Sequence, residues 1–312
     1  MVSLGIIIDR KCNIRCSHCC FSSCPQAEEH LSDEEIMRII TEGCNNSEVD
    51  TISLSGGEAL LRKDIVLKAI TYISQNGKKP TLVSNGFWGR NKKSALTMLT
   101  NLKNSGLRGL KISFDDFHQD NLKVQRIKNI LDANVKVRIP ISLNVAVSKS
   151  FKSDKILADL GASILGVRVT KFPIQQVGAA CQYSDEEIIK RYNCIDDLHC
   201  PGFEVTYHFD GKVYPCCSPT VFDTCLSVAD VDSSVEKSIF NIKHNLLLSA
   251  LRKRGFKWLF EKCIERGLID DSYMNRRYVD ACEMCRILFS SEETAKGIIS
   301  ILKDEYGLSD GK

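Results

Sequence analysis

The stretch of sequence that decides the fold is Leu4-Gly-Ile-Ile-Ile8 followed by Asp9-Arg-Lys-Cys12-Asn-Ile-Arg-Cys16-Ser-His-Cys19-Cys20. The apolar run predicts a buried β-strand, and the cysteines follow it directly with the spacing C-x3-C-x2-C. Three thiolates from one short loop can hold a [4Fe–4S] cluster and leave one iron open to another ligand. Because a structural zinc site uses four protein ligands, the alternatives are a zinc site completed by a distant residue and a set of buried thiols.

Composition limits the class of protein. The chain has 312 residues, of which 43% are hydrophobic and 26% are charged, as in an ordinary globular protein. Its net charge of +3 is too small to indicate a nucleic-acid partner. No apolar run approaches the roughly 18 residues of a membrane span, and no secretory signal precedes the first strand. We therefore predict a cytoplasmic protein without nucleic-acid or membrane partners, whose 15 cysteines serve metal or thiol chemistry rather than disulfides.

Apolar runs of strand length alternate with segments of helical periodicity in the first half. The predicted strands cover residues 4–8, 51–54, 81–83, 110–114, 139–147 and 167–170, and the predicted helices cover residues 33–42, 64–74, 94–104, 122–132 and 155–159. A further helix is predicted to begin at Ser184-Asp-Glu-Glu187, which has the pattern of a capping box. This alternation predicts a parallel sheet with helices outside it, either doubly wound or barrel-like. Ligands of such sheets bind at the carboxyl ends of the strands, where the cysteine loop lies.

Polar residues follow the later predicted strands as well. The second strand ends in Ser55-Gly56-Gly57-Glu58, in which the glycines allow close backbone approach to a ligand and Glu58 offers an acceptor. Later strands end in Asn85, Ser113, Asp115 and Asn144. A tight turn at the glycines and ordinary polar loop residues at the other positions are the alternatives to ligand contacts. Asp116 and His118 are predicted to be solvated loop residues.

In the second half the spacing of apolar residues changes from the helical period of 3.6 residues to the strand period of 2 residues. Glu204–Phe209 and Lys212–Cys217 are predicted to pair as a hairpin through Asp210-Gly211, which favours a two-residue type I′ turn. Four cysteines lie before, within and after this hairpin, namely Cys200, Cys216, Cys282 and Cys285. Together these four thiols could provide the four ligands of one metal or cluster site. A zinc ribbon and unconnected buried thiols are the alternatives to an iron–sulfur cluster at this site.

The two-residue turn also predicts a register. It places Val205 opposite Cys216 and Glu204 opposite Cys217, and it points the two adjacent cysteines to opposite faces of the hairpin. If Cys216 is a ligand, Cys217 is therefore a free thiol with a carboxylate across from it. A negative charge nearby disfavours the thiolate, and a protonated thiol is a poor nucleophile but a suitable hydrogen-atom donor. A surface acid beside a core thiol is the alternative.

The cysteine spacing, with Gly-Gly-Glu one strand–helix unit later, resembles the radical SAM superfamily, although Ala59 stands where that family usually has proline. The resemblance implies an α/β fold with an open (β/α)6 partial TIM barrel in residues 1–195, and a [4Fe–4S] cluster that binds S-adenosyl-L-methionine (SAM). The implied cluster ligands are Cys12, Cys16 and Cys19. The implied SAM contacts are His18, Ser55, Gly56, Gly57, Glu58, Asn85, Ser113, Asp115 and Asn144.

Residues 196–312 resemble the twitch domain, a short form of the SPASM domain. The implied structure is a small α+β domain with a β-hairpin and helices, which binds one auxiliary [4Fe–4S] cluster through Cys200, Cys216, Cys282 and Cys285.

Longer stretches resemble the radical SAM peptide epimerases of the epipeptide type. They are residues 19–23, 82–89, 163–173, 198–202, 214–219 and 254–258. This resemblance implies conversion of L-residues to D-residues in a ribosomally synthesised precursor peptide, with Cys217 returning a hydrogen atom and Glu204 in an acidic position of the family. A flavodoxin or ferredoxin would supply electrons. The alternatives are radical cross-linking of a peptide through thioether or carbon–carbon bonds, dehydrogenation of a small alcohol, and a non-catalytic zinc-binding protein.

Overall fold

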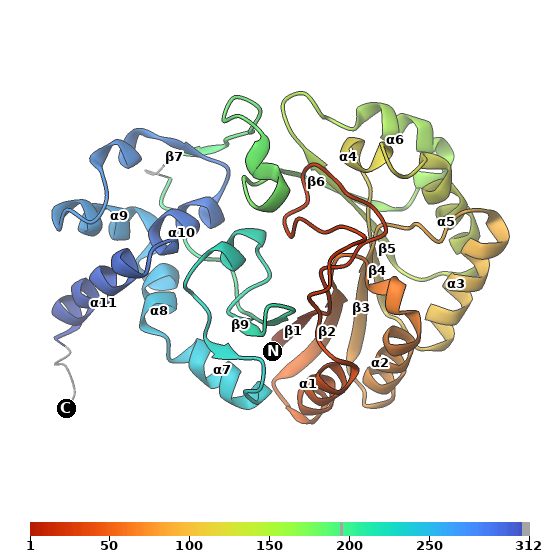
Figure 1. Ribbon diagram of the computed structural model, residues 1–312, viewed down its shortest axis with the longest axis horizontal. Coiled ribbons are helices and arrows are strands. Elements are labelled where there is room, and N and C mark those ends of the chain that lie inside the picture. Colours follow the sequence, from red (N-terminus) through yellow and green to blue (C-terminus); the bar gives the residue numbers. More distant parts are fainter. Residues whose placement is uncertain (194–195, 308–312) are drawn as a thin grey trace.

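The computed structural model of the protein describes residues 1–193 and 196–307 (Figure 1). Within these residues, nine strands form one sheet in the order β10-β9-β8-β1-β2-β3-β4-β5-β6. The strands are β1 (Val2–Ile7), β2 (Val49–Ser55), β3 (Lys79–Ser84), β4 (Gly109–Ser113), β5 (Ile141–Val147), β6 (Arg168–Pro173), β8 (Glu204–His208), β9 (Lys212–Tyr214) and β10 (Ala229–Asp230). A separate antiparallel pair joins β7 (Tyr192–Asn193) to β11 (Arg277–Tyr278).

The first six strands are parallel and lie in the order of the sequence. The helices between them pack on the outer face of the sheet (Figure 1). They are α1 (Asp33–Asn45), α2 (Lys63–Gln75), α3 (Lys92–Asn104), α5 (Val124–Val137) and α6 (Asp154–Leu160). The short α4 (Asp116–Gln119) lies instead at the carboxyl end of β4. The sheet does not close on itself, so the predicted open (β/α)6 partial barrel is confirmed, and every predicted strand and interstrand helix is present with slightly different bounds.

The two faces of the sheet differ in chemistry. Towards the helices point large apolar side chains that are almost completely buried, among them Leu4, Ile52, Leu82, Leu110 and Leu143. The opposite face has a row of small residues in register across five strands, namely Thr206, Gly5, Ser53, Thr81 and Gly109. Because these side chains are short, they take up little space on the concave face of the sheet.

The predicted helix at residues 184–187 is absent, which corrects the capping-box interpretation. Residues 185–187 form a turn. The Glu187 carboxylate accepts hydrogen bonds from Ser148 Oγ at 3.0 Å and from Ser150 Oγ at 2.7 Å. Glu187 therefore fixes the segment after β5 instead of starting a helix, and the sequence pattern alone does not distinguish these two uses of the carboxylate.

The second half adds strands to the same sheet. β8 pairs with β1 in parallel, and β9 pairs with β8 in antiparallel orientation. The remaining helices pack beyond these strands (Figure 1). They are α7 (Val235–Lys243), α8 (Leu246–Lys253), α9 (Gly255–Glu265), α10 (Ala281–Phe289) and α11 (Glu292–Tyr306). The predicted boundary between residues 195 and 196 falls at residues 194–195, which lie outside the described residues, so the division into two domains stays a prediction.

None of the helices in the described part of the chain combines the length and the apolar character needed to cross a membrane.

The register of the hairpin differs from the predicted one. Tyr207 pairs with Val213, and Thr206 pairs with Tyr214, so the pairing is shifted by one residue. The loop has three residues, Phe209–Gly211, and Gly211 has a φ of +84°. Asp210 has no positive φ, whereas a type I′ turn needs positive φ at both central residues. Its carboxylate accepts from Lys212 N at 3.0 Å and from Tyr214 Oη at 2.8 Å, which stabilises the longer loop.

This loop gives a testable prediction. Gly211→Ala is expected to lower the free energy of unfolding by about 1 kcal/mol, because a Cβ disfavours left-handed backbone. No atom lies within 4 Å of the added Cβ, so a clash does not contribute. Gly211→Asn is the matched control, since asparagine tolerates this conformation and should cost clearly less. Urea unfolding of the three proteins measures the difference, and equal costs for Ala and Asn would contradict the loop conformation.

Candidate active site

The loop that follows β1 is fixed to the turn after β2 by backbone contacts. Gly57 N donates to Asp9 O at 2.8 Å, and Glu58 N donates to Lys11 O at 2.9 Å. A Cβ on Gly57 would lie 2.2 Å from Lys11 O, so only glycine permits this approach. In this structure the Gly-Gly pair holds the cysteine loop at the carboxyl ends of the strands.

Cys12, Cys16 and Cys19 line one end of a cavity of about 430 Å³. The Cys12 and Cys16 side chains are buried, and burial raises the pKa of the Cys12 thiol to about 12 in the cluster-free protein. Asn85 Nδ2 lies 3.6 Å from Cys12 Sγ, and Ser23 N donates to Cys19 Sγ at 3.3 Å. Three sulfurs with N–H donors around them fit the donor set of a [4Fe–4S] cluster with one open iron.

The predicted SAM contacts meet around this cavity with one exception. Those that line it are His18, Ser55, Gly56, Gly57, Asn85, Ser113, Asp115 and Asn144. They come from the cysteine loop and from the ends of β2 to β5. Parallel strands that end at one edge of the sheet bring residues distant in sequence together in this way. Their contacts with SAM stay predictions.

Glu58 is the exception. Its buried carboxylate points into the protein and accepts hydrogen bonds from Asn85 N at 2.7 Å, Ser84 Oγ at 3.0 Å and Leu60 N at 3.1 Å. Burial raises the pKa of Glu58 to about 7 despite these donors. Glu58 is not among the residues that line the cavity. These hydrogen bonds join the turn after β2 to the end of β3, and the contact of Glu58 with SAM stays a prediction like the others.

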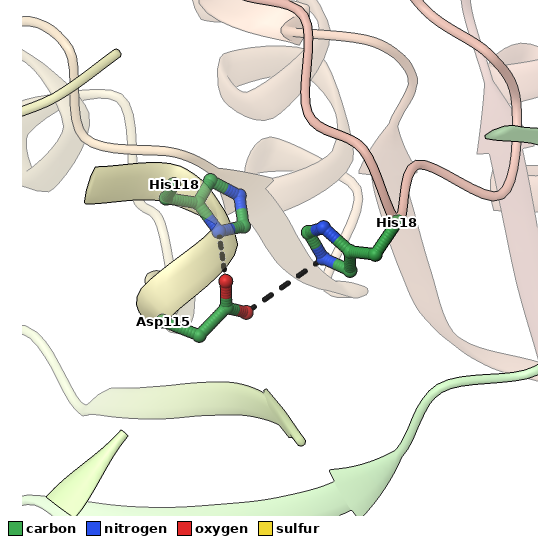
Figure 2. Close-up of side chains that lie close together, drawn as sticks. All are labelled: His18, Asp115 and His118. Carbon is green, nitrogen blue, oxygen red and sulfur yellow. Dashed lines mark hydrogen bonds and ion pairs between the residues drawn. The ribbon is translucent and has the colours of Figure 1, made fainter. Parts of the chain in front are cut away.

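Asp115 joins two histidines at the cavity wall (Figure 2). One carboxylate oxygen lies 2.7 Å from His118 Nδ1, and the other lies 3.7 Å from His18 Nε2. Although burial opposes ionisation, His118 and His18 hold the pKa of Asp115 below its usual range. Burial lowers the pKa of His18 to about 4, so this ring is neutral, and it stacks on Phe117 with the ring centroids 4.5 Å apart.

This trio could hold a metal ion by distance, since its ligand atoms lie within 4.8 Å of one another. The Asp115 oxygens, however, also accept hydrogen bonds from Phe117 N at 3.1 Å and Ala146 N at 3.0 Å. These bonds favour an internal hydrogen-bond network over a metal site, and in this network the neutral His18 ring lines the cavity. His18 Nδ1 is buried and has no hydrogen-bond partner among the described residues.

The four cysteines of the second half also converge. Burial raises the pKa of the Cys285 thiol well above its ordinary value, and the neighbouring sulfurs of Cys216, Cys200 and Cys282 add to this effect. Cys282 and Cys285 lie one turn apart on α10. A Cβ on Gly202 would lie 3.2 Å from Cys216 Cβ and 3.9 Å from Cys200 Sγ. Four partly buried thiols from three segments fit either an auxiliary [4Fe–4S] cluster or zinc.

Cys217 lies outside this set and stands on the concave side of the sheet. Its side chain is accessible to solvent. Although solvent reaches the side chain, partial desolvation raises the pKa of its thiol, the Glu204 carboxylate beside it adds to the rise, and Lys111 of β4 opposes it. The neighbourhood of Glu204 and Cys217 is thus as predicted, although the hairpin register behind that prediction was wrong. Gly5 makes room for Glu204, because a Cβ there would lie 2.9 Å from Glu204 Oε1.

Sequence reasoning missed part of the cavity wall. His118 is buried and lines the cavity, so its prediction as a solvated residue is wrong. His118 follows Asp115 by three residues, and this spacing on a short helix could have indicated that the two side chains interact. The second half contributes Ser218, Pro219 and Asp280. Asp280 caps α10 by accepting from Cys282 N at 2.8 Å and also accepts from Gln175 Nε2 at 2.8 Å, which links the two cysteine sites.

Comparison with known proteins agrees with this geometry. The Radical SAM superfamily model matches residues 6–139. YydG of Bacillus subtilis (strain 168), provisionally named a peptide biosynthesis protein, is 38% identical over 296 residues, which are 93% of each chain. GTP 3′,8-cyclase of Campylobacter jejuni (strain RM1221) is 26% identical over 167 residues, which are 50% of each chain.

Two solved structures share the fold. Native anSMEcpe with bound AdoMet and the Cp18Cys peptide aligns with a TM-score of 0.57 and 13% identity, over 97% of this chain and 99% of the other. BtrN in complex with AdoMet and 2-DOIA aligns with a TM-score of 0.51 and 14% identity, over 94% of this chain and 96% of the other. At these identities the alignments establish similarity of fold alone.

The backbone contact at Gly57 gives a prediction. Gly57→Ala is expected to displace the cysteine loop and reduce the iron bound at Cys12, Cys16 and Cys19 to less than half, because the added Cβ meets a carbonyl oxygen that cannot move alone. Gly109→Ala is the matched control, since its Cβ would make only ordinary contacts with Thr81. Iron analysis of protein purified without oxygen measures the change. Full iron content in Gly57→Ala would disprove this role.

The two cysteine sets predict the metal content. Protein purified without oxygen should contain about eight iron and eight sulfide ions, corresponding to two [4Fe–4S] clusters. Cys12→Ala and Cys282→Ala should each lose about half of them, because the sets bind separately, while the exposed Cys181→Ala should lose none. Zinc in the wild type that disappears only in Cys282→Ala would instead assign a zinc site to the second half.

Proposed function

The chain belongs to the radical SAM superfamily, and we propose that it converts L-residues to D-residues in a ribosomally synthesised peptide. It is a radical SAM enzyme related over nearly its whole length to a protein whose name ties it to peptide biosynthesis. When bound at Cys12, Cys16 and Cys19, the cluster with SAM supplies a radical that removes a hydrogen atom. What distinguishes an epimerase from other members is a second group that returns hydrogen to the same carbon.

The observation that carries the proposal is the position of Cys217. This thiol lies outside the set formed by Cys200, Cys216, Cys282 and Cys285, and its charged neighbours are Glu204 and Lys111 of β4. The next two residues, Ser218 and Pro219, line the same cavity as the cysteine loop. Inversion at Cα requires hydrogen removal on one face and hydrogen return on the other, so the proposal requires a peptide held over the cavity to lie between the cysteine loop and the Cys217 thiol.

The residues around Cys217 suit hydrogen return. Its S–H bond breaks, a Cα–H bond forms on the substrate, and the sulfur is left as a radical. Restoring the thiol takes one electron and one proton. We propose that the Glu204 carboxylate, beside the sulfur, relays this proton from solvent and that a flavodoxin or ferredoxin supplies the electron. Cys200, Cys216, Cys282 and Cys285 would hold the auxiliary cluster next to this thiol.

Replacement of Cys217 tests this function. Cys217→Ser should still cleave SAM to 5′-deoxyadenosine in the presence of reductant and the precursor peptide encoded beside the gene. It should form no D-residue, because the hydroxyl O–H bond is too strong to donate a hydrogen atom. The exposed Cys181→Ser is the control and should retain D-residue formation. Reactions in deuterated water are analysed by chiral amino-acid analysis and mass spectrometry.

The same experiment separates the alternatives. The wild type should add one deuterium at each inverted Cα. A product lighter by two hydrogens would indicate cross-linking of the peptide. D-residues at the wild-type level in Cys217→Ser would rule out Cys217 as the hydrogen donor.

A further inference from the structure

β6 is the last strand of the sheet and is open on its outer side. Each residue from Arg168 to Phe172 is exposed, including the apolar Val169 at 36% and Phe172 at 42%. Within residues 1–193 and 196–307, β6 pairs with β5 and no strand pairs with its other edge. Proteins usually cover, shorten or interrupt such an edge, because its unpaired backbone groups can bind another chain.

The backbone groups at the free edge can be identified. Ile174 N donates to Val147 O at 3.0 Å, which points Ile174 towards β5. Backbone groups in a parallel strand alternate between the two sides, so Arg168, Thr170 and Phe172 also face β5. The N–H and C=O groups of Val169 and Lys171 therefore face outwards. Pro173 follows on the same side and has no N–H, so the free donors end there.

This edge leads into the site. Phe172, Pro173, Ile174 and Gln175, at the end of β6 and directly after it, line the same cavity as the cysteine loop. An extended segment paired with Val169 and Lys171 would run along the cavity wall and bring its own backbone to the cavity. The side chains on both faces of β6 are exposed, so such a segment would meet no covering element.

We propose that the substrate peptide binds in extended form to the free edge of β6 and adds a strand to the sheet beside the cavity. This inference rests on the proposed function, in which the substrate is a peptide and the reacting atom is a backbone Cα. Backbone hydrogen bonds to β6 would fix the Cα atoms of the peptide whatever its side chains are. Pockets beside the strand would then select among the peptide's side chains. A second copy of this chain is the other possible occupant of the edge.

Hydrogen exchange with residue-level mass spectrometry tests the proposal on the cluster-loaded enzyme. Without peptide, the Val169 and Lys171 amides should exchange quickly, while those of Thr170 and Phe172, bonded to β5, should be protected. Adding the precursor peptide encoded beside the gene should slow exchange at Val169 and Lys171 at least tenfold. Unchanged exchange at saturating peptide would overturn the proposal. Protection that appears without peptide and rises with enzyme concentration would assign the edge to a second copy and also overturn it.

A proline variant provides an independent measurement. Val169→Pro removes the outward N–H and keeps the bonds to β5, so the Kd of the peptide should rise about tenfold through the loss of ladder hydrogen bonds. Val169→Ala keeps the N–H and should leave the Kd within about twofold. Equal affinities of the two variants would contradict pairing at this edge. Thermal unfolding verifies that both variants are folded.

The outcomes separate this proposal from the proposed function. Protection of Val169 and Lys171 without any D-residue would support docking and contradict epimerisation. D-residue formation without protection would support epimerisation and overturn docking at β6.

Discussion

The site depends on the direct backbone contact between the cysteine loop and the turn after β2. The carbonyl oxygens of Asp9 and Lys11 accept from Gly57 N and Glu58 N, and a side chain on Gly57 would push the two segments apart. Glu58 extends this contact by holding Ser84 and Asn85 at the end of β3. Asn85 in turn reaches Cys12 Sγ. Three loops thus become one rigid support, and the burial of Glu58 is acceptable because its carboxylate is hydrogen-bonded.

Much of the fold could be predicted because its signals are local. Six strands with interstrand helices follow from the alternation of apolar runs, and the order of the strands follows from short connections. The predictions that failed depend on choices between similar local structures. Asp210 and Gly211 are compatible with both a two-residue turn and a three-residue loop. The hydrogen bonds that the Asp210 carboxylate accepts stabilise the three-residue loop. Glu187 suits a capping box but binds Ser148 and Ser150 instead.

The site was predictable where sequence spacing fixes geometry and not where tertiary contacts do. Residues at the ends of β2 to β5 line one cavity because parallel strands end at one edge. His118 was missed because a short helix turns it back onto Asp115. Asp280 was missed because it reaches the cavity from the distant second half, and no local pattern indicates this. Glu58 lies in the expected loop, but its interactions are internal, which a motif cannot reveal.

The pairing of β8 with β1 has a consequence for the order in which the protein is made. β1 is among the first segments to leave the ribosome. Its partner on one side, β8, begins at Glu204 and is made about 200 residues later. At ordinary rates of synthesis about 10 to 40 s separate the two. During this time the edge of β1, directly before the cysteine loop, has no partner strand on that side. An incomplete chain therefore carries an open strand edge directly before Cys12, Cys16 and Cys19 until β8 has been made.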